Sequence, residues 1–297
     1  MSVISLKQTV TNSQDGALAI RPLQPTIGAE ISGVDLSQPL DDAARDAIRA
    51  AVLRHKVVFF RDQDITRDQQ LVFARRFGPI YTHPTTAGVD GHPQIHGITA
   101  AEFAKHEQAK REAAAKAGRV DTTHEEKFHT DTSWRLVPAW GAVLRGVTIP
   151  EVGGDTIWVD AEAAYNGLPE DVKRRLDGLH VTHDFRDALN KVGKDYPIVA
   201  HPVARRHPET GATILWVNYS QKPQILGLEL AESRELLAII LNQYKRPEYQ
   251  VRFQWRPNSV AFWDNRAAVH YAVRNYGDFP RVVERVLIAD QAHHADL

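Results

Sequence analysis

The chain has 297 residues, of which 43% are hydrophobic and 25% charged, and its formal net charge is −1. This balance is ordinary for a globular protein and gives no global field that would attract nucleic acid or an anionic membrane surface. The absence of cysteine excludes disulfides, thiol nucleophiles, iron–sulfur clusters and thiolate zinc sites, so any metal must be held by His, Asp or Glu.

The N-terminal part of the chain predicts strands and helices in alternation. Residues 1–16 are polar and are predicted to be flexible, and they lack the basic cluster and apolar run of a secretory signal. A cytoplasmic location without a membrane partner is expected, because no stretch of about 18 apolar residues could span a bilayer.

Strands are predicted in the N-terminal part at residues 18–23, 27–36 and 57–60, and helices at residues 40–56 and 66–78. Asp41 or Asp42 and Thr66 are the expected N-caps, and Gly78 is expected to end the second helix.

Residues 101–127 differ in character from their surroundings. They are rich in alanine, lysine and glutamate and contain few large apolar side chains. One interpretation is a solvated surface helix followed by a loop. The other is an insert that acts as a lid over an active site, because the segment leads directly into His129.

The rest of the chain consists of short apolar segments separated by glycine, proline and asparagine. Strands are predicted at residues 140–150, 154–161, 178–185, 198–206, 213–218, 251–255, 259–265 and 282–290, and helices at residues 168–179 and 231–245. The sequences "RHPETG" (206–211) and "RPN" (256–258) are predicted to form hairpin turns. Many strands with a few helices favour an antiparallel sandwich or barrel with helices outside it. No repeat or linker is visible, so residues 1–297 are predicted to form a single domain.

The stretch "KFHTDTSW" (127–134) places His129 and Asp131 two positions apart. On an extended chain these side chains point to the same side. A third ligand is offered by His270, which follows a predicted strand and a polar turn. Two histidines and one carboxylate form the facial triad of non-haem iron(II) oxygenases, although the same set could hold zinc and favour hydrolysis. Other histidines are predicted to have structural roles, namely His180, His183, His201, His207, His293 and His294. Of these, His201 and His207 flank a predicted turn and are expected to have no nearby carboxylate.

An oxygenase of this kind needs 2-oxoglutarate, whose remote carboxylate requires a fixed cation. The segment "FPRVVERVLIAD" supplies Arg281 and Arg285, four residues apart and therefore on the same side of an extended strand. The alternative is that Arg281 lies in solvent before the strand begins. The tryptophans Trp134, Trp158, Trp216 and Trp263 are expected to fill the core rather than to form a substrate cage.

The ordered set of motifs resembles the taurine dioxygenase and 2,4-dichlorophenoxyacetate dioxygenase family of iron(II)/2-oxoglutarate enzymes. The motifs are "IGAEISGVDL", "HKVVFFRDQ", "FARRFGPIYTHP", "FHTDTSW", "IPEVGGDTIWVDAEAAYNGLP" and "WDNRAAVHYAV" followed by "FPRVVERV". The resemblance implies a mainly β fold with flanking helices and a double-stranded β-helix (jelly-roll) core. It also implies a dioxygenase that uses iron(II), 2-oxoglutarate and O2 to hydroxylate a small acidic organic substrate. Hydroxylation of a carbon that bears oxygen or sulfur would then lead to C–O or C–S cleavage.

The resemblance also assigns roles to individual residues. It implies that His129, Asp131 and His270 bind iron(II) and that Thr156 and Arg281 bind 2-oxoglutarate. It also implies that His83 and Arg285 bind the substrate, with Arg285 at the acidic group of an alkyl sulfate, sulfonate or aryloxyalkanoate. Homo-oligomers are common among such relatives, so a homo-oligomer is expected.

Two positions depart from the family pattern. Phe128 stands where tryptophan is usual, and Glu125 stands where the taurine enzymes have asparagine, which questions taurine as the substrate. The rival readings are a metal-dependent hydrolase and a non-catalytic binding protein on the same scaffold.

Overall fold

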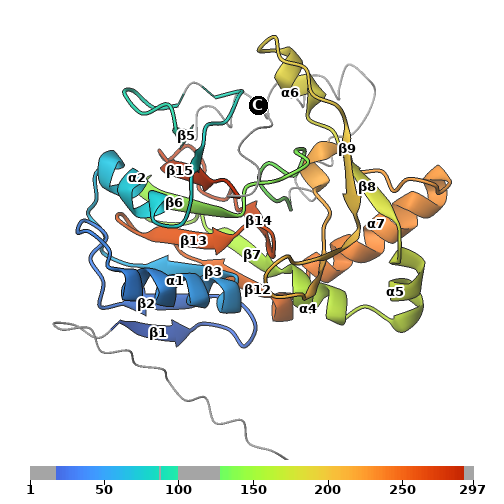
Figure 1. Cartoon of the computed structure of the whole chain (residues 1–297), viewed down its shortest axis with the longest axis horizontal. Helices are drawn as coiled ribbons and strands as arrows, with labels where there is room; N and C mark the ends of the chain where they lie inside the picture. The colour runs from blue at the N-terminus through green and yellow to red at the C-terminus, as the bar shows by residue number, and fades with distance from the viewer. Residues whose placement is uncertain (1–17, 87, 100–127, 291–297) are drawn as a thin grey trace, which may run out of the picture.

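The structure is a computed structural model that describes residues 18–86, 88–99 and 128–290 (Figure 1). The strands are β1 (Ala19–Pro22), β2 (Ala29–Ser32), β3 (Val57–Phe60), β4 (Ile80–Tyr81), β5 (Ile95–Thr99), β6 (Gly141–Thr148), β7 (Thr156–Asp160), β8 (His180–His183), β9 (Val199–Pro202), β10 (Ala204–Arg206), β11 (Thr213–Leu215), β12 (Gln250–Phe253), β13 (Val260–Asp264), β14 (Ala268–Ala272) and β15 (Val282–Ile288). The helices are α1 (Asp42–His55), α2 (Arg67–Arg75), α4 (Ala161–Asn166), α5 (Glu170–Leu176), α6 (Arg186–Asn190) and α7 (Leu230–Tyr244), with short 3-10 helices at Tyr219–Gln221 and Pro247–Tyr249. The predicted flexible N-terminus, the predicted lid at 101–127 with Glu125, and His293 and His294 lie outside the described residues.

The two N-terminal helices begin where the sequence predicts. The side chain of Asp41 accepts a hydrogen bond from the backbone N–H of Ala44 and caps α1. Thr66 and Gln69 form a reciprocal capping box at the start of α2. These side chains satisfy N–H groups that have no partner within the helix, so the local sequence fixes both starting points.

A larger sheet has the strand order β1-β2-β3-β13-β6-β15-β4, and β5 also pairs with β15. A smaller sheet has the order β12-β7-β14, and two further antiparallel pairs join β8 to β9 and β10 to β11. Among the described strands, every pairing is antiparallel except that of β2 with β3. The prediction of a hairpin at "RHPETG" is confirmed by β10 and β11, whereas the hairpin at "RPN" is wrong. That turn connects β12 of the smaller sheet to β13 of the larger one, so the flanking strands do not pair.

The two sheets pack face to face through side chains that alternate along their strands. Phe59 of β3 and Trp263 of β13 point to the smaller sheet, where they join Trp158 and Phe253 in one apolar cluster. The rings of Phe59 and Phe253 are stacked with centroids 4.0 Å apart. This alternation is what an antiparallel sheet buried on both faces requires.

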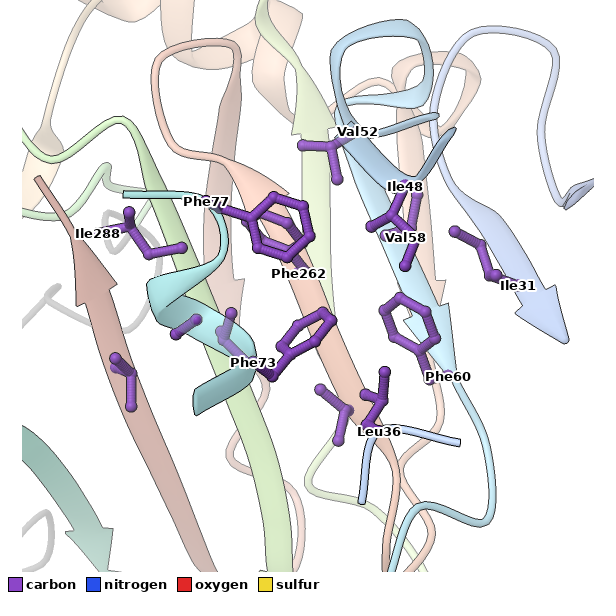
Figure 2. Close-up of a cluster of buried hydrophobic side chains, with 14 of the residues drawn as sticks. Ile31, Leu36, Ile48, Val52, Val58, Phe60, Phe73, Phe77, Phe262 and Ile288 are labelled. Atoms are coloured by element: carbon purple, nitrogen blue, oxygen red, sulfur yellow. The ribbon is translucent and has the colours of Figure 1, made fainter. Parts of the chain in front are cut away.

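Helices cover the outer faces of both sheets. On the outer face of the larger sheet, Phe60 and Phe262 pack with Ile48 and Val52 of α1 and with Phe73 of α2 (Figure 2). Behind the smaller sheet, α7 contributes Leu236, Ile240 and Tyr244 to a further cluster that includes residues of α4, α5, β7 and β14. The predicted mainly β fold with flanking helices is confirmed. In the described ranges, no helix combines the length and the apolar character that crossing a membrane requires.

Candidate metal centre

Backbone pairing brings His129 and His270 together across 141 positions of the sequence. The N–H of His129 donates to the carbonyl of His270 over 3.0 Å, and the N–H of His270 donates to the carbonyl of His129 over 2.8 Å. Residues that exchange both hydrogen bonds in an antiparallel pair project their side chains to the same face. The two imidazole centroids accordingly lie 4.1 Å apart.

Asp131 is held in place by a buried amide. Asn265, in the turn between β13 and β14, accepts from the backbone N–H of Asp131 over 2.9 Å and donates to its carbonyl over 2.8 Å. The same side-chain amino group donates to the carbonyl of Ala139 over 2.9 Å. Asn265 lies only five positions before His270. One short stretch of chain therefore provides the candidate ligand His270 and orients the candidate ligand Asp131.

The three candidate ligands offer atoms that all lie within 4.8 Å of one another. Nε2 of His129 and Nε2 of His270 are each 3.9 Å from Oδ1 of Asp131. His129 is the most accessible of the three, with 28% of its side chain exposed, against 6% for Asp131 and 9% for His270.

The protonation states suit a divalent metal. Burial acts against the charged carboxylate, but Arg285 and the nearby imidazoles lower the pKa of Asp131 to about 2. Burial and the neighbouring His129 lower the pKa of His270 well below its ordinary value. An ionised carboxylate and a neutral imidazole are the forms that bind metal.

Two buried polar atoms of this centre have no hydrogen-bond partner among the described residues, Oδ2 of Asp131 and Nδ1 of His270. Unpartnered buried polar atoms are costly and need an explanation. A bound ion would provide one for Oδ2 of Asp131, whereas Nδ1 of His270 lies on the ring edge away from Nε2, the nitrogen that is 3.9 Å from Asp131. The donor set of two imidazoles and one carboxylate fits iron(II).

Arg281 and Thr156 both contact the start of β7, which pairs with the strand that carries His270. Nε of Arg281 donates to the carbonyl of Gly154 over 3.0 Å, two residues before Thr156. Arg281 is 4% exposed, so the alternative that it lies in solvent is wrong. Burial lowers its pKa, and no described carboxylate lies within ion-pair distance of it. The hydroxyl of Thr156 accepts from Nε1 of Trp255 over 2.9 Å, which leaves its own proton available to an acceptor.

On the other side of Asp131, Arg285 lies in a cluster with two histidines. Its Nη1 is 2.5 Å from Oδ1 of Asp131, and its Nη2 is 3.0 Å from Nδ1 of His96. The ring of His83 stacks beside that of His96 with centroids 6.1 Å apart. Burial and the charge of Arg285 lower the pKa of His83 to about 4 and that of His96 to about 3. The predicted substrate residues His83 and Arg285 thus lie together, next to the predicted metal ligand Asp131.

Two residues of this region, His96 and Asn265, could not be recognised from the sequence. β5, which carries His96, was not predicted, because "QIHGI" lacks a clear alternation of apolar and polar residues. Asn265 ends a predicted strand, where asparagine usually indicates only a turn. Its complete burial, which reveals the role, is a property of the fold and not of the local sequence.

Among the described residues, none of the histidines predicted to be structural belongs to the group of candidate metal ligands. His183 and His201 are buried with their rings 5.2 Å apart, and Nε2 of His201 bonds the carbonyls of Ser133 and Arg135. His207 was expected to have no nearby carboxylate, and this was wrong. Its Nε2 lies 2.9 Å from Oδ2 of the buried Asp264, which the fold brings from 57 positions away. The four tryptophans predicted to fill the core, Trp134, Trp158, Trp216 and Trp263, are each at most 1% exposed.

Comparison with known proteins points to the same family that the sequence motifs resemble. The profile described as "Taurine catabolism dioxygenase TauD, TfdA family" matches residues 19–287. The alpha-ketoglutarate-dependent sulfate ester dioxygenase of Pseudomonas putida is 36% identical over 291 residues, which cover 92% of this chain and 90% of that protein.

Solved structures agree with the sequence matches. The crystal structure of a taurine dioxygenase from Burkholderia xenovorans superposes with a TM-score of 0.78 at 36% identity, over 92% of this chain and 90% of that one. The crystal structure of AAD-2 in complex with Mn(II) and N-oxalylglycine superposes with a TM-score of 0.71 at 25% identity, over 92% of this chain and 98% of that one. Together with the two facing sheets, these neighbours confirm the predicted jelly-roll core.

Proposed function

We infer from its membership of the TauD/TfdA family that this chain is an iron(II)- and 2-oxoglutarate-dependent dioxygenase, and we propose that its substrate is a small organic sulfate ester. Dioxygenase chemistry on a small acidic organic compound follows from the family and the named relatives. The rival readings, a metal-dependent hydrolase and a non-catalytic binding protein, have no support among these relatives. The choice of sulfate ester rests on the sulfate ester dioxygenase that matches nearly the whole chain.

The observation that carries this proposal is a group of three candidate metal ligands, one of which is bonded by Arg285, together with a buried arginine that has no carboxylate partner among the described residues. His129, Asp131 and His270 are proposed to hold iron(II). Arg281 and Thr156, at the start of β7, are proposed to bind the remote carboxylate and an oxygen of 2-oxoglutarate. A buried guanidinium that lacks a carboxylate partner is the group that such a dicarboxylate would satisfy.

When bound, iron(II) and 2-oxoglutarate supply the oxidising chemistry, in which O2 converts 2-oxoglutarate to succinate and carbon dioxide and a substrate C–H bond to C–OH. Arg285 and His83 are proposed to hold the anionic head of the substrate, so that the adjacent carbon faces the metal centre. The aromatic neighbours of His83, which include Trp134 and Phe185, exclude water on that side.

Positioning of this carbon determines the products. In a sulfate ester, the carbon next to the ester oxygen receives the hydroxyl group. Loss of the hydroxyl proton and formation of a C=O bond then break the C–O bond, and the products are an aldehyde and sulfate. The protein must therefore select the carbon beside the head group, which a fixed anion site achieves by orientation alone.

A coupled product assay tests the proposed substrate class. The purified chain is loaded with iron(II) and 2-oxoglutarate and given alkyl sulfates, alkyl sulfonates and aryloxyalkanoates of similar size, with succinate and inorganic sulfate measured together. We expect succinate and sulfate in equal amounts with alkyl sulfates and only in the presence of O2. Sulfate release without O2 would support the hydrolase reading, and stimulation by aryloxyalkanoates alone would overturn the sulfate ester proposal.

The homo-oligomeric state and the cytoplasmic location expected from the sequence are part of the same proposal. Both depend on the resemblance to the family, and size-exclusion chromatography with light scattering would test the oligomeric state.

A further inference from the structure

The turn between β13 and β14 (residues 265–267) is part of the metal centre, because it carries Asn265 and leads into His270. β13 belongs to the larger sheet and β14 to the smaller one, so in the described sheets no ladder hydrogen bonds join the two strands. Other contacts must therefore fix the direction in which the chain leaves β13. A shift of this turn would move the amide that bonds Asp131.

The carboxylate of Asp264, the last residue of β13, provides such a contact. It is 1% exposed, and it accepts from the backbone N–H and from Nε of Arg266 over 2.9 Å each. A carboxylate that bonds the backbone two residues ahead closes a turn around the residue between them, which here is Asn265. Burial acts against the charged carboxylate, but hydrogen bonds from His207 and Arg266 lower the pKa of Asp264 to about 2. Asp264 therefore stays ionised and holds the turn.

His207 reaches this carboxylate from the hairpin of β10 and β11, 57 positions earlier in the sequence. Its Nδ1 accepts from the backbone N–H of Thr210 over 3.1 Å, so the ring proton lies on Nε2. This N–H donates to Oδ2 of Asp264 over 2.9 Å. The imidazole thus joins the hairpin turn to the β13–β14 turn, and both contacts are buried because His207 is 2% exposed.

A second contact joins the same two turns nearer the surface. Nη2 of Arg266 lies 2.6 Å from Oε1 of Glu209, which follows His207 by two positions in the hairpin turn. The side chain of Glu209 is 32% exposed, and it also accepts from Arg49 of α1 over 2.8 Å. Solvent weakens an exposed ion pair, so the buried contact through His207 is expected to hold the turn more firmly.

We propose that His207 is a positioning residue for the metal centre, because it holds the carboxylate of Asp264 and with it the turn that carries Asn265. The proposal rests on the metal centre of the proposed function and adds a residue outside the group of candidate ligands. A purely structural role would reduce stability without reducing metal affinity. A positioning role predicts that metal affinity follows the contact to Asp264 and not the overall stability.

Two amide substitutions separate the two contacts of the ring. In His207→Asn, the side-chain oxygen takes the place of Nδ1 and keeps the hairpin turn, but the donor to Asp264 is lost. In His207→Gln, the amide nitrogen reaches the place of Nε2 and keeps that donor, but the acceptor for the hairpin turn is lost. Each variant leaves a buried group without its partner, so both should be less stable in urea unfolding. The control is His180→Asn on β8, at an exposed position.

Calorimetric titration of the metal-free proteins with Mn(II) measures the predicted difference. His207→Asn should bind Mn(II) about tenfold more weakly than the wild type, as is usual when a group that orients metal ligands is lost. His207→Gln should bind like the wild type although it is also less stable, and His180→Asn should match the wild type in both measurements. Wild-type affinity in His207→Asn, or an equal loss in His207→Asn and His207→Gln, would overturn the proposal.

Glu209→Ala covers the case in which His207→Asn does not fold. It removes only the partly exposed contact to Arg266, so Mn(II) binding should weaken about twofold to fivefold, and unchanged binding would then count against the proposal. If the wild type binds Mn(II) but does not oxidise alkyl sulfates, the proposed substrate class fails and the role of His207 is still decided by the variants. Failure of the wild type to bind Mn(II) would overturn both the metal centre and the role of His207.

Discussion

Asn265 carries no ionisable group, yet its amide determines where the carboxylate of Asp131 lies. It bonds both backbone groups of Asp131 and also the carbonyl of Ala139. In Asn265→Asp, a carboxylate oxygen would replace the amino group that faces the carbonyls of Asp131 and Ala139. Repulsion between these oxygens would displace the segment that carries Asp131. We expect metal affinity to fall about tenfold to a hundredfold, as it does when groups that orient metal ligands are lost.

Calorimetric titration with Mn(II) would measure this change. Asn242→Asp, on the exposed side of α7, introduces the same chemical change away from the site and should bind like the wild type. Equal affinities for all three proteins would show that Asn265 has no part in placing Asp131.

Arg281 supports a second prediction about a single side chain. It is buried, and its only hydrogen bond among the described residues is to the carbonyl of Gly154. Arg281→Ala should raise the KM for 2-oxoglutarate steeply, because loss of one partner of a buried charge pair costs about 2–5 kcal/mol. Arg281→Lys should restore only part of the affinity, since an ammonium group cannot make the bidentate contact. Arg234→Ala, at an exposed position of α7, is the control, and an unchanged KM in Arg281→Ala would remove Arg281 from the co-substrate site.

The identities of these side chains could be predicted only in part. Periodicity predicts that His129 and Asp131 point to the same side, and their side chains do approach one another. It predicts the same for Arg281 and Arg285, but β15 begins only at Val282 and its register shifts between Val282 and Val283, so the two arginines do not share one regular strand. His270 was predicted to be near them only because the triad needed a third ligand and the motifs resembled a family. Residues such as Asn265 and His96 act through neighbours that are distant in sequence, and no local pattern indicates such contacts.

At the scale of elements, the connection between β6 and β7 controls the space around Arg281. Gly154 has a φ of +73°, and a Cβ there would lie 3.1 Å from both Cδ and Nε of Arg281. Gly154→Ala should therefore raise the KM for 2-oxoglutarate in addition to the strain of about 1–2 kcal/mol that a left-handed residue carries.

Gly193→Ala separates the two effects. Gly193 has a similar φ of +67°, but a Cβ there meets nothing within 4 Å. It should show a comparable loss of stability in urea unfolding and an unchanged KM for 2-oxoglutarate. If both variants bind 2-oxoglutarate equally well, contact between the β6–β7 connection and Arg281 does not matter for the co-substrate.

Elements with strong local signals were predicted, and those defined by long-range pairing were not. The starts of α1 and α2 follow from Asp41 and Thr66, which act within one helical turn. The turn at 256–258 reads locally like a hairpin, but β12 and β13 find partners in different sheets. Whether two strands that follow one another pair or separate depends on the whole topology, which a turn sequence does not specify.

At the scale of the whole molecule, buried histidines should make stability depend on pH. Burial lowers the pKa of His183 to about 3 and that of His201 to about 4. At pH values between about 6.5, the ordinary pKa of histidine, and these lowered values, both imidazoles bind protons in the unfolded chain but not in the folded chain. Stability is therefore fully present above pH 6.5 and is lost as pH falls towards 4, by up to about 1.4 kcal/mol per pH unit for each such imidazole.

His183→Asn should flatten this dependence by up to one group's share. Its effect is measured as the slope of the unfolding free energy between pH 7 and pH 5, which is less sensitive to the absolute stability of the variant. His180→Asn removes an exposed histidine and should leave the slope unchanged. The same slope in wild type and His183→Asn would show that His183 is protonated in the folded protein.

The mainly β architecture was predictable from strand-like segments, because central strands such as β3 and β13 are buried and apolar on both faces. Periodicity alone could not predict the jelly-roll arrangement, which was expected only because the ordered motifs resemble those of a known family. Pairing such as that of His129 with His270 closes a loop of 141 positions, and only the complete topology specifies it.

The central claim is that His129, Asp131 and His270 bind one metal ion together. The most direct measurement is an anaerobic titration with iron(II), comparing the wild type with His129→Ala, Asp131→Ala and His270→Ala. The claim predicts one tightly bound iron per chain in the wild type and loss of that binding in each variant, with His180→Asn behaving like the wild type. Undiminished one-to-one binding in any of the three alanine variants would contradict it.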